Sequence, residues 1–222
     1  MPLVHPALLG LTTRHIDPRG AAGLAGAPAA VEEAGRRGLV ELVADGSLAA
    51  DVLRDEGAPL DLDSLVRLAG GLAAREPLWR PLVRHDPEKR WYTRLLLTGV
   101  VEVWLIGWAP GQHTAVHDHG GALGALAVAD GAVEEDIHTA RGGAWEPGPT
   151  RRYSRGRAVG FAAEHVHRVI NRTALPATTV HAYSPPEVPL RYAAQAGSVT
   201  VPSDPGSLLR TDRVPAAAAA AR

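Results

Sequence analysis

Two histidines separated by one residue, His117 and His119, place the strongest constraint on what this chain can form. In an extended strand successive side chains point to opposite faces, so residues two apart share a face and both imidazoles can reach one point. Pro110-Gly111 predicts a turn before this pair, and Asp130-Gly131 predicts a hairpin turn after the apolar run 122–129. The pattern is typical of a metal site built on strands.

The spacing around this pair resembles the first motif of the cupins. In that motif a glycine, five residues, His-x-His, four residues, a glutamate, six residues and a glycine follow in order. Gly111 and Gly131 fit the two glycines. Gly124 stands where cupins usually carry a glutamate ligand, so the resemblance implies a site of histidines without a carboxylate.

A later stretch, residues 156–171, resembles the second cupin motif in its spacing. The register implies His167 as the third ligand. His165 is the alternative, because it lies two residues away and could share the same face. The motif register and the sequence HRVIN favour His167.

Composition limits both the ligands and the partners of such a site. The 222 residues, 45% of them hydrophobic and 21% charged, are enough for one buried core. Because the chain has no cysteine, a metal must be held by nitrogen or oxygen. The formal net charge of −1 predicts no binding of nucleic acid or of an anionic membrane surface.

The chain shows neither a signal peptide nor an apolar run long enough to span a membrane, so we expect a cytoplasmic protein, and a monomer. A single domain is expected in three parts. Residues 1–90 form an N-terminal arm and helices packed on a barrel, residues 91–196 form the barrel with the metal site, and residues 197–222 form a flexible tail.

Three short helices are predicted before the barrel. Apolar spacing indicates one over residues 31–43, a second follows Ser47, and a third is capped by Asp63 and ends before Pro77. From residue 91 short β-like runs recur at the spacing of a sandwich or barrel, which predicts a mainly β, jelly-roll fold. The expected strands are 91–97, 101–108, 114–119, 123–128, 133–138, 158–161, 168–171 and 178–183.

Four segments together resemble the cysteine dioxygenases, the thiol dioxygenase branch of the cupins, in their bacterial form. They are YTR at 92–94, W-x-P-G at 108–111 leading to HDH at 117–119, HRV-x-N at 167–171 and H-x-YSPP at 181–186. The resemblance implies a mononuclear Fe²⁺ held by His117, His119 and His167. It also implies that the substrates are L-cysteine and O₂ and that the product is cysteine sulfinic acid.

The resemblance assigns roles to further residues. Arg94 would pair with the substrate carboxylate, with Tyr92 beside it in the substrate site. Tyr183 would place its hydroxyl near substrate and oxygen, with His181 behind it, and Thr179 stands where the family has serine. These three alternate along one expected strand and could form a relay. Animal members carry a cysteine joined to the tyrosine, but Gly124 occupies that position here, so no such crosslink forms.

The chemistry fits these residue types. Three neutral imidazoles leave a divalent metal its full charge and open positions for thiolate, amine and dioxygen. Zinc binds the same ligands but has no redox chemistry with which to activate oxygen. Two alternatives remain: a dioxygenase of another small thiol, such as 3-mercaptopropionate, and a non-catalytic metal-binding cupin. Family members that prefer 3-mercaptopropionate tend to carry glutamine at the arginine position, so Arg94 favours cysteine.

Overall fold

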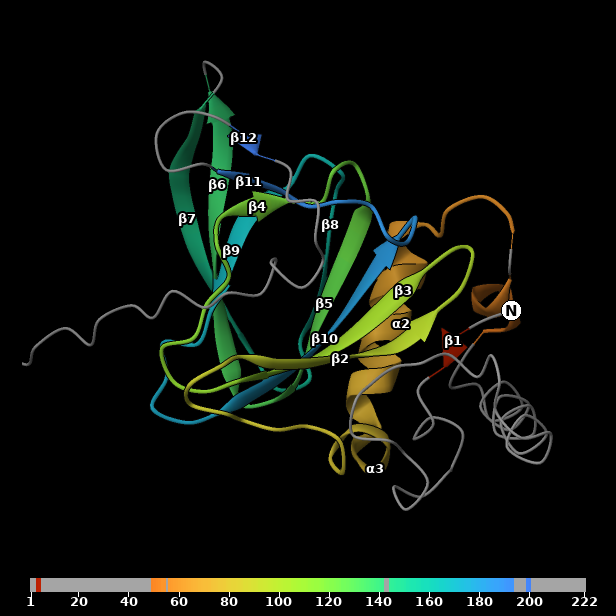
Figure 1. Ribbon diagram of the computed structural model, residues 1–222, viewed down its shortest axis with the longest axis horizontal. Helices are drawn as coiled ribbons and strands as arrows, with labels where there is room; N and C mark the ends of the chain where they lie inside the picture. Colours follow the sequence, from red (N-terminus) through yellow and green to blue (C-terminus); the bar gives the residue numbers. More distant parts are fainter. Residues whose placement is uncertain (1–2, 5–48, 55, 142–143, 194–198, 201–222) are drawn as a thin grey trace, which may run out of the picture.

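Two antiparallel sheets of six strands form the body of the computed structural model (Figure 1), which describes residues 3–4, 49–54, 56–141, 144–193 and 199–200. The first sheet has the order β1 (Leu3–Val4), β2 (Trp91–Leu97), β3 (Glu102–Trp108), β10 (Ala177–Ser184), β5 (Leu123–Asp130) and β8 (Ala158–Phe161). The second has the order β12 (Val199–Thr200), β11 (Arg191–Ala193), β4 (His117–Asp118), β9 (Val166–Ile170), β6 (Ala132–Arg141) and β7 (Ala144–Ser154). The predicted mainly β, cupin-type jelly roll is confirmed.

Helix α2 (Leu62–Ala74) covers the outer face of the first sheet, where it contacts β5, β8 and β10 (Figure 1). Its buried side chains recur at three and four residues, as the sequence predicted. The predicted cap was wrong by two residues. Asp61, not Asp63, precedes the helix, and its carboxylate accepts a hydrogen bond from the Ser64 N–H at 2.7 Å.

The described residues form two further, shorter helices. A 3₁₀ helix, η3 (Ala50–Leu53), lies where a helix was predicted after Ser47. Helix α3 (Glu76–Trp79) follows α2 directly and carries Pro77 in its first turn, where a missing N–H costs nothing. The helix predicted over residues 31–43 lies outside the described residues.

Alternation along β5 and β10 separates two apolar clusters. On one face Ala125, Ala127, Val180 and Ala182 join the core beneath α2. These side chains are small, so the helix can lie close to the sheet. The opposite faces point between the two sheets, into the cluster that contains Ile106, Trp108, Leu126, Val133 and Val169. The functional residues of β10 lie on this inner face.

The structure differs from the predicted strands in several places: β1 and β12 were not predicted, and the predicted strand 114–119 is reduced to His117–Asp118. β7 was not predicted, because its Pro and Gly residues indicate a loop; as an edge strand it tolerates Pro147. β11 was also missed. Asp130-Gly131 is not a hairpin turn, since β5 before it and β6 after it belong to different sheets. Gly131, with φ of 70°, turns the chain from one sheet to the other.

The structure describes only part of the predicted N-terminal arm and of the predicted C-terminal tail. Of the arm, residues 3–4 form β1 beside β2. Of the predicted tail, residues 199–200 form β12 beside β11, and the rest of 197–222 lies outside the described residues. None of the helices in the described part of the chain is long and apolar enough to cross a membrane.

Candidate active site

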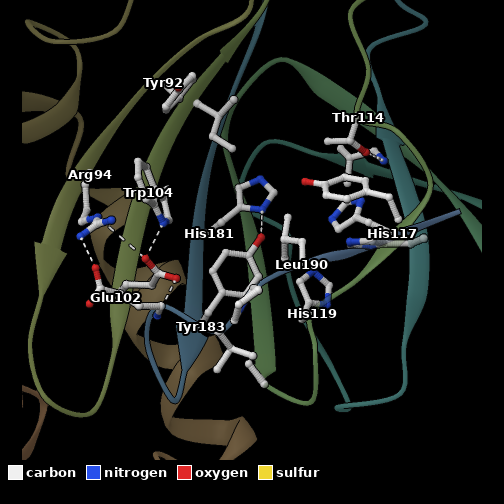
Figure 2. Close-up of a pocket in the computed structure, with 18 of the residues that line it drawn as sticks. Tyr92, Arg94, Glu102, Trp104, Thr114, His117, His119, His181, Tyr183 and Leu190 are labelled. Carbon is white, nitrogen blue, oxygen red and sulfur yellow. Dashed lines mark hydrogen bonds and ion pairs between the residues drawn. The ribbon is translucent and has the colours of Figure 1, made fainter. Parts of the chain in front are cut away.

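A cavity of about 400 Å³ opens between the two sheets (Figure 2). Strands of the first sheet supply one wall, with Arg94 from β2 and His181 and Tyr183 from β10. Strands of the second sheet supply the other, with His117 from β4 and His167 from β9. Figure 2 shows His181 and Tyr183 between Arg94 on one side and His117 and His119 on the other.

The three predicted metal ligands meet at this cavity. One ring nitrogen each of His117, His119 and His167 lies within 4.8 Å of the others, and all three side chains are buried. Antiparallel pairing places His117 directly opposite His167. β4 is only two residues long, so His119 lies just beyond it, yet its ring centroid is 5.1 Å from that of His117 and 5.0 Å from that of His167.

Hydrogen bonds determine which ring nitrogen of His117 and of His167 faces the point where the three histidines meet. His117 Nδ1 lies 2.8 Å from the Ala115 carbonyl oxygen, and His167 Nδ1 lies 2.7 Å from Glu135 Oε1. Each Nδ1–H donates to its oxygen, which leaves each Nε2 as a bare acceptor. Both ring nitrogens of His119 are buried without a hydrogen-bond partner among the described residues. A metal ion is the partner that such an orphaned nitrogen fits, because burying an unpaired polar group is costly.

The histidines are held in the neutral form that binds metals. Burial lowers the pKa of His117 and of His119 well below the usual value, and the neighbouring imidazoles lower it further. Burial also lowers the pKa of His167, against the effect of Glu135. Neutral imidazole is the ligand form of histidine, so the site needs no proton release before it binds a cation.

Glu135, which the sequence did not indicate as a site residue, orients the ring of His167 through a hydrogen bond. Burial alone would raise the pKa of its carboxyl, but hydrogen bonds from His165, His167 and Tyr153 outweigh this and keep that pKa well below its ordinary value. The Tyr153 hydroxyl donates to Glu135 Oε2 at 2.6 Å. An ionised carboxylate therefore accepts the Nδ1–H of His167 and orients its ring.

His165, the alternative third ligand, binds the same carboxylate as His167, and the two ring centroids are 5.0 Å apart. His165 Nε2 is 2.7 Å from Glu135 Oε1, the oxygen that also binds His167. These three residues form a second group with metal-binding atoms, but hydrogen bonds already join them. It is His167, not His165, that the fold brings together with His117 and His119.

The sequence profile of the family described as cysteine dioxygenase type I matches residues 40–193. The chain belongs to this family. No curated protein matches it. Among solved structures, the TT1209 protein from Thermus thermophilus is 24% identical over 48% of this chain and 92% of its own, with a TM-score of 0.41. A conserved protein with a double-stranded beta-helix domain from Klebsiella pneumoniae is 20% identical over 51% and 87%, with a TM-score of 0.45.

The predicted relay of this dioxygenase-family chain is assembled along β10. Thr179 Oγ1 lies 2.8 Å from His181 Nε2, and His181 Nδ1 lies 3.0 Å from the Tyr183 hydroxyl. Trp108 Nε1 donates to Thr179 Oγ1 at 2.8 Å, a partner that the sequence did not reveal. His181 Nε2 is the acceptor available to the Thr179 hydroxyl among the described residues, so His181 carries its proton on Nδ1 and donates to Tyr183. The hydroxyl hydrogen of Tyr183 is then left to face the cavity.

Burial fixes the protonation of this relay. It lowers the pKa of His181 to about 3 and raises that of Tyr183 above its ordinary value. Both groups are therefore neutral across the physiological range. The arrangement presents a phenol as a hydrogen-bond donor beside His119, whose ring centroid is 5.0 Å from that of Tyr183.

The two predicted substrate-binding residues of β2 also line the cavity. Tyr92 packs against Trp104, with ring centroids 5.8 Å apart. Arg94 lies over the same indole, 4.7 Å from its centroid, and forms ion pairs with two carboxylates. Arg94 Nη1 is 3.2 Å from Glu187 Oε1, and Arg94 Nε is 3.8 Å from Glu102 Oε2.

A second arginine of this wall, Arg90, was not predicted. It lies one residue before β2 and lines the cavity with only 1% of its surface exposed. The signal in the sequence is its spacing: residues 90, 92 and 94 alternate and so share the inner face. A family resemblance that begins at Tyr92 does not include it.

Proposed function

We propose that this protein is an iron-dependent thiol dioxygenase that adds both atoms of O₂ to the sulfur of L-cysteine and gives cysteine sulfinic acid. Membership of the cysteine dioxygenase type I family supports the reaction class. The observation that carries the proposal is the set of three neutral, buried imidazoles, in which both nitrogens of His119 lack a hydrogen-bond partner among the residues that the structure describes. A cytoplasmic location and a monomeric state stay predictions.

The donor set supports iron as the metal. Three imidazoles suit first-row transition metals, and no thiolate or carboxylate completes the group among the described residues. His117, His119 and His167 would hold the ion, with their orientation set by the Ala115 carbonyl and by Glu135. Ferrous iron, when bound, supplies the redox chemistry that activates dioxygen toward a thiol sulfur.

The remaining residues position the substrate and hold protons. Tyr183 offers its hydroxyl hydrogen to the cavity, and the bond from His181 Nδ1–H makes that hydroxyl a better donor. Thr179 fixes the tautomer of His181. Arg94 on β2 pairs with the substrate carboxylate, the role that the family resemblance assigns to it, and Tyr92 lies next to it on the same strand.

Oxygen consumption with L-cysteine tests the proposal. The iron-loaded protein should consume about one O₂ for each cysteine, and mass spectrometry should show the sulfinate as the product. His119→Ala, which removes a ligand from the centre, is the matched control and should be inactive. A protein that consumed 3-mercaptopropionate far faster than cysteine would be a dioxygenase of that thiol, and one that consumed oxygen with neither would be a metal-binding cupin without this activity.

A further inference from the structure

Strand β11 lies directly beside the histidine pair. Antiparallel pairing of β11 with β4 sets Tyr192 opposite His117. The same pairing sets Arg191 opposite Asp118, the residue between the two ligands. Directly opposed residues of paired strands have their side chains on the same face of the sheet. On the inner face, His167, His117 and Tyr192 therefore follow one another across β9, β4 and β11, while Arg191 and Asp118 share the outer face.

Tyr192 forms part of the cavity wall at the metal-binding histidines. Its ring centroid lies 5.8 Å from that of His117, with an angle of 35° between the two planes. Tyr192 lines the cavity together with the residues that precede it in the chain, Val188, Pro189 and Leu190. A phenol ring is large and rigid, so its position determines how much bulk a ligand can carry near the histidines.

An ion pair on the outer face holds β11 in this position. Arg191 Nε donates to Asp118 Oδ1 at 2.8 Å, and Arg191 Nη2 lies 2.7 Å from Asp118 Oδ2. Two parallel bonds of this kind fix the orientation of a guanidinium as well as its distance. Asp118 is buried, and its Oδ1 also accepts the Gly120 N–H at 2.9 Å. The ion pair thus joins β11 to the loop that carries His117 and His119.

Backbone contacts join the same two segments on either side of Tyr192. Before it, a β-carbon on Gly120 would lie only 2.3 Å from the Pro189 carbonyl oxygen, so the two backbones touch at a glycine whose φ is 62°. After it, the Ala193 N–H donates to the Val116 carbonyl oxygen at 3.1 Å. Tyr192 is therefore held against the ligand loop from both directions along the chain.

We infer that Tyr192 is a specificity residue that limits the bulk on the sulfur-bearing carbon of the thiol, and that Arg191 and Asp118 are positioning residues for its ring. The inference rests on the proposed function in taking a thiol at the histidine centre. Sulfur at that centre brings the carbon bonded to it nearest to the ring beside His117. The cavity then accepts a thiol that is unbranched at this carbon and excludes one that carries two methyl groups there.

Anaerobic calorimetric titration of the iron-loaded protein tests this without turnover. The two probes are L-cysteine and L-penicillamine, which has the same charged groups and two additional methyl groups on the carbon bonded to sulfur. The parent should bind penicillamine at least about tenfold more weakly than cysteine, because one methylene against a packed wall discriminates by about 10- to 200-fold. In Tyr192→Ala the two affinities should come within about threefold of each other.

Removal of the ion pair should change the same ratio of affinities. Arg191→Met should reduce the preference for cysteine by about three- to tenfold, because the ring of Tyr192 is no longer held. In a Tyr192→Ala background the same substitution should change the ratio by less than about twofold, because Arg191 acts through that ring. Arg172→Met is the matched control. Its side chain is also partly exposed and pairs with Glu134 and Asp136 on β6, so the ratio should stay that of the parent.

Four results would overturn the inference. The parent could bind the two thiols equally well, or Tyr192→Ala could keep the ratio of the parent. Arg191→Met could shift the ratio no more than Arg172→Met does, or it could shift it as much in the Tyr192→Ala background as in the parent. Arg191→Lys, which keeps the charge without the planar fork, gives the same comparison if the methionine variant does not fold.

The titration also separates this inference from the proposed function, because binding is measured without oxygen. A protein that discriminates between the thiols through Tyr192 but oxidises neither would refute the proposed function and leave the inference standing. A protein that oxidises cysteine but keeps its ratio of affinities in Tyr192→Ala would refute the inference alone. A parent that bound neither thiol would refute both.

Discussion

The ring of Phe161 fills the space that a side chain at Gly124 would need. The two residues face each other across β5 and β8, and a β-carbon on Gly124 would overlap the phenylalanine ring. Phe161 in turn stacks on His119, with ring centroids 4.8 Å apart. The position where other cupins carry a glutamate, and where animal cysteine dioxygenases carry the crosslinked cysteine, is thus closed by an aromatic ring that supports a histidine of the centre.

Gly124→Ala should therefore destabilise the fold. Overpacking a filled interior costs about 1–3 kcal/mol of unfolding free energy, measurable by denaturant titration. In a Phe161→Leu background the same change should cost much less, because the ring is gone. The control is Gly70→Ala in α2, where the new methyl would come no closer than 3.5 Å to its nearest neighbour, Ala158 Cβ, and helix propensity favours alanine. Additive effects of Gly124→Ala and Phe161→Leu would contradict this explanation.

Iron binding should require His167 and not His165. His167→Ala removes a nitrogen from the group of three, so the protein should lose most of its iron, as measured by elemental analysis after desalting. His165→Ala removes a hydrogen bond to Glu135 and the stacking of this ring on Phe161, but no nitrogen of the group of three, so the protein should keep nearly all of its iron. The assignment is reversed if the His165 variant is the one that comes out without metal.

Much of this centre could be predicted from the sequence because it depends on local spacing. His117 and His119 are two residues apart, and so are the members of the Thr179, His181 and Tyr183 relay. Glu135 could not be predicted. It lies in the run VEED, which indicates a solvated face, and only the pairing of β6 with β9 turns it toward His167. Register between strands far apart in the sequence is a property of the fold, and no local pattern states it.

The carboxylate of Glu135, which accepts the Nδ1–H of His167, should affect metal affinity. Glu135→Gln keeps the shape but removes the charge that orients the imidazole, and such changes typically weaken metal binding by about 10- to 100-fold. A competition titration with a fluorescent chelator measures this. Glu134→Gln is the matched control: its carboxylate pairs with Arg172 at 2.8 Å, away from the centre, so the affinity should not change. Equal losses in the two variants would point to a general effect on β6.

The hydroxyl of Thr179 should matter more than its methyl group. Thr179→Val leaves the Trp108 N–H without an acceptor and His181 Nε2 without a donor, which should cost about 1–3 kcal/mol of stability. Turnover should fall by about ten- to a hundred-fold, because His181 is no longer held as the Nδ1–H tautomer that orients Tyr183. Thr179→Ser keeps the hydroxyl and should stay within about threefold of the parent. Similar turnover in the valine and serine variants would exclude the relay.

Stability at acid pH should depend on Asp136, on the outer side of β6. Arg168 Nη2 and Arg172 Nη2 approach its Oδ2 at 2.6 and 2.7 Å, and Thr150 donates to its Oδ1 at 2.7 Å. Burial alone would raise the pKa of this carboxyl, but these hydrogen bonds hold that pKa well below its ordinary value. A depressed pKa means that the folded state favours the ionised form, so the stabilisation is complete above the ordinary aspartate value and is lost as pH falls below it.

Asp136→Asn should therefore lower the free energy of unfolding by about 1–2 kcal/mol at pH 7. The difference from the parent should stay constant down to about pH 5 and shrink as the pH falls below about 4, toward the depressed pKa of the folded state. Denaturant titrations at several pH values measure it. Glu164→Gln, at an exposed position without a described ion pair, should show little change at any pH. A difference for Asp136→Asn that stayed the same down to pH 2 would mean that packing, and not the charge of this carboxylate, stabilises the strand.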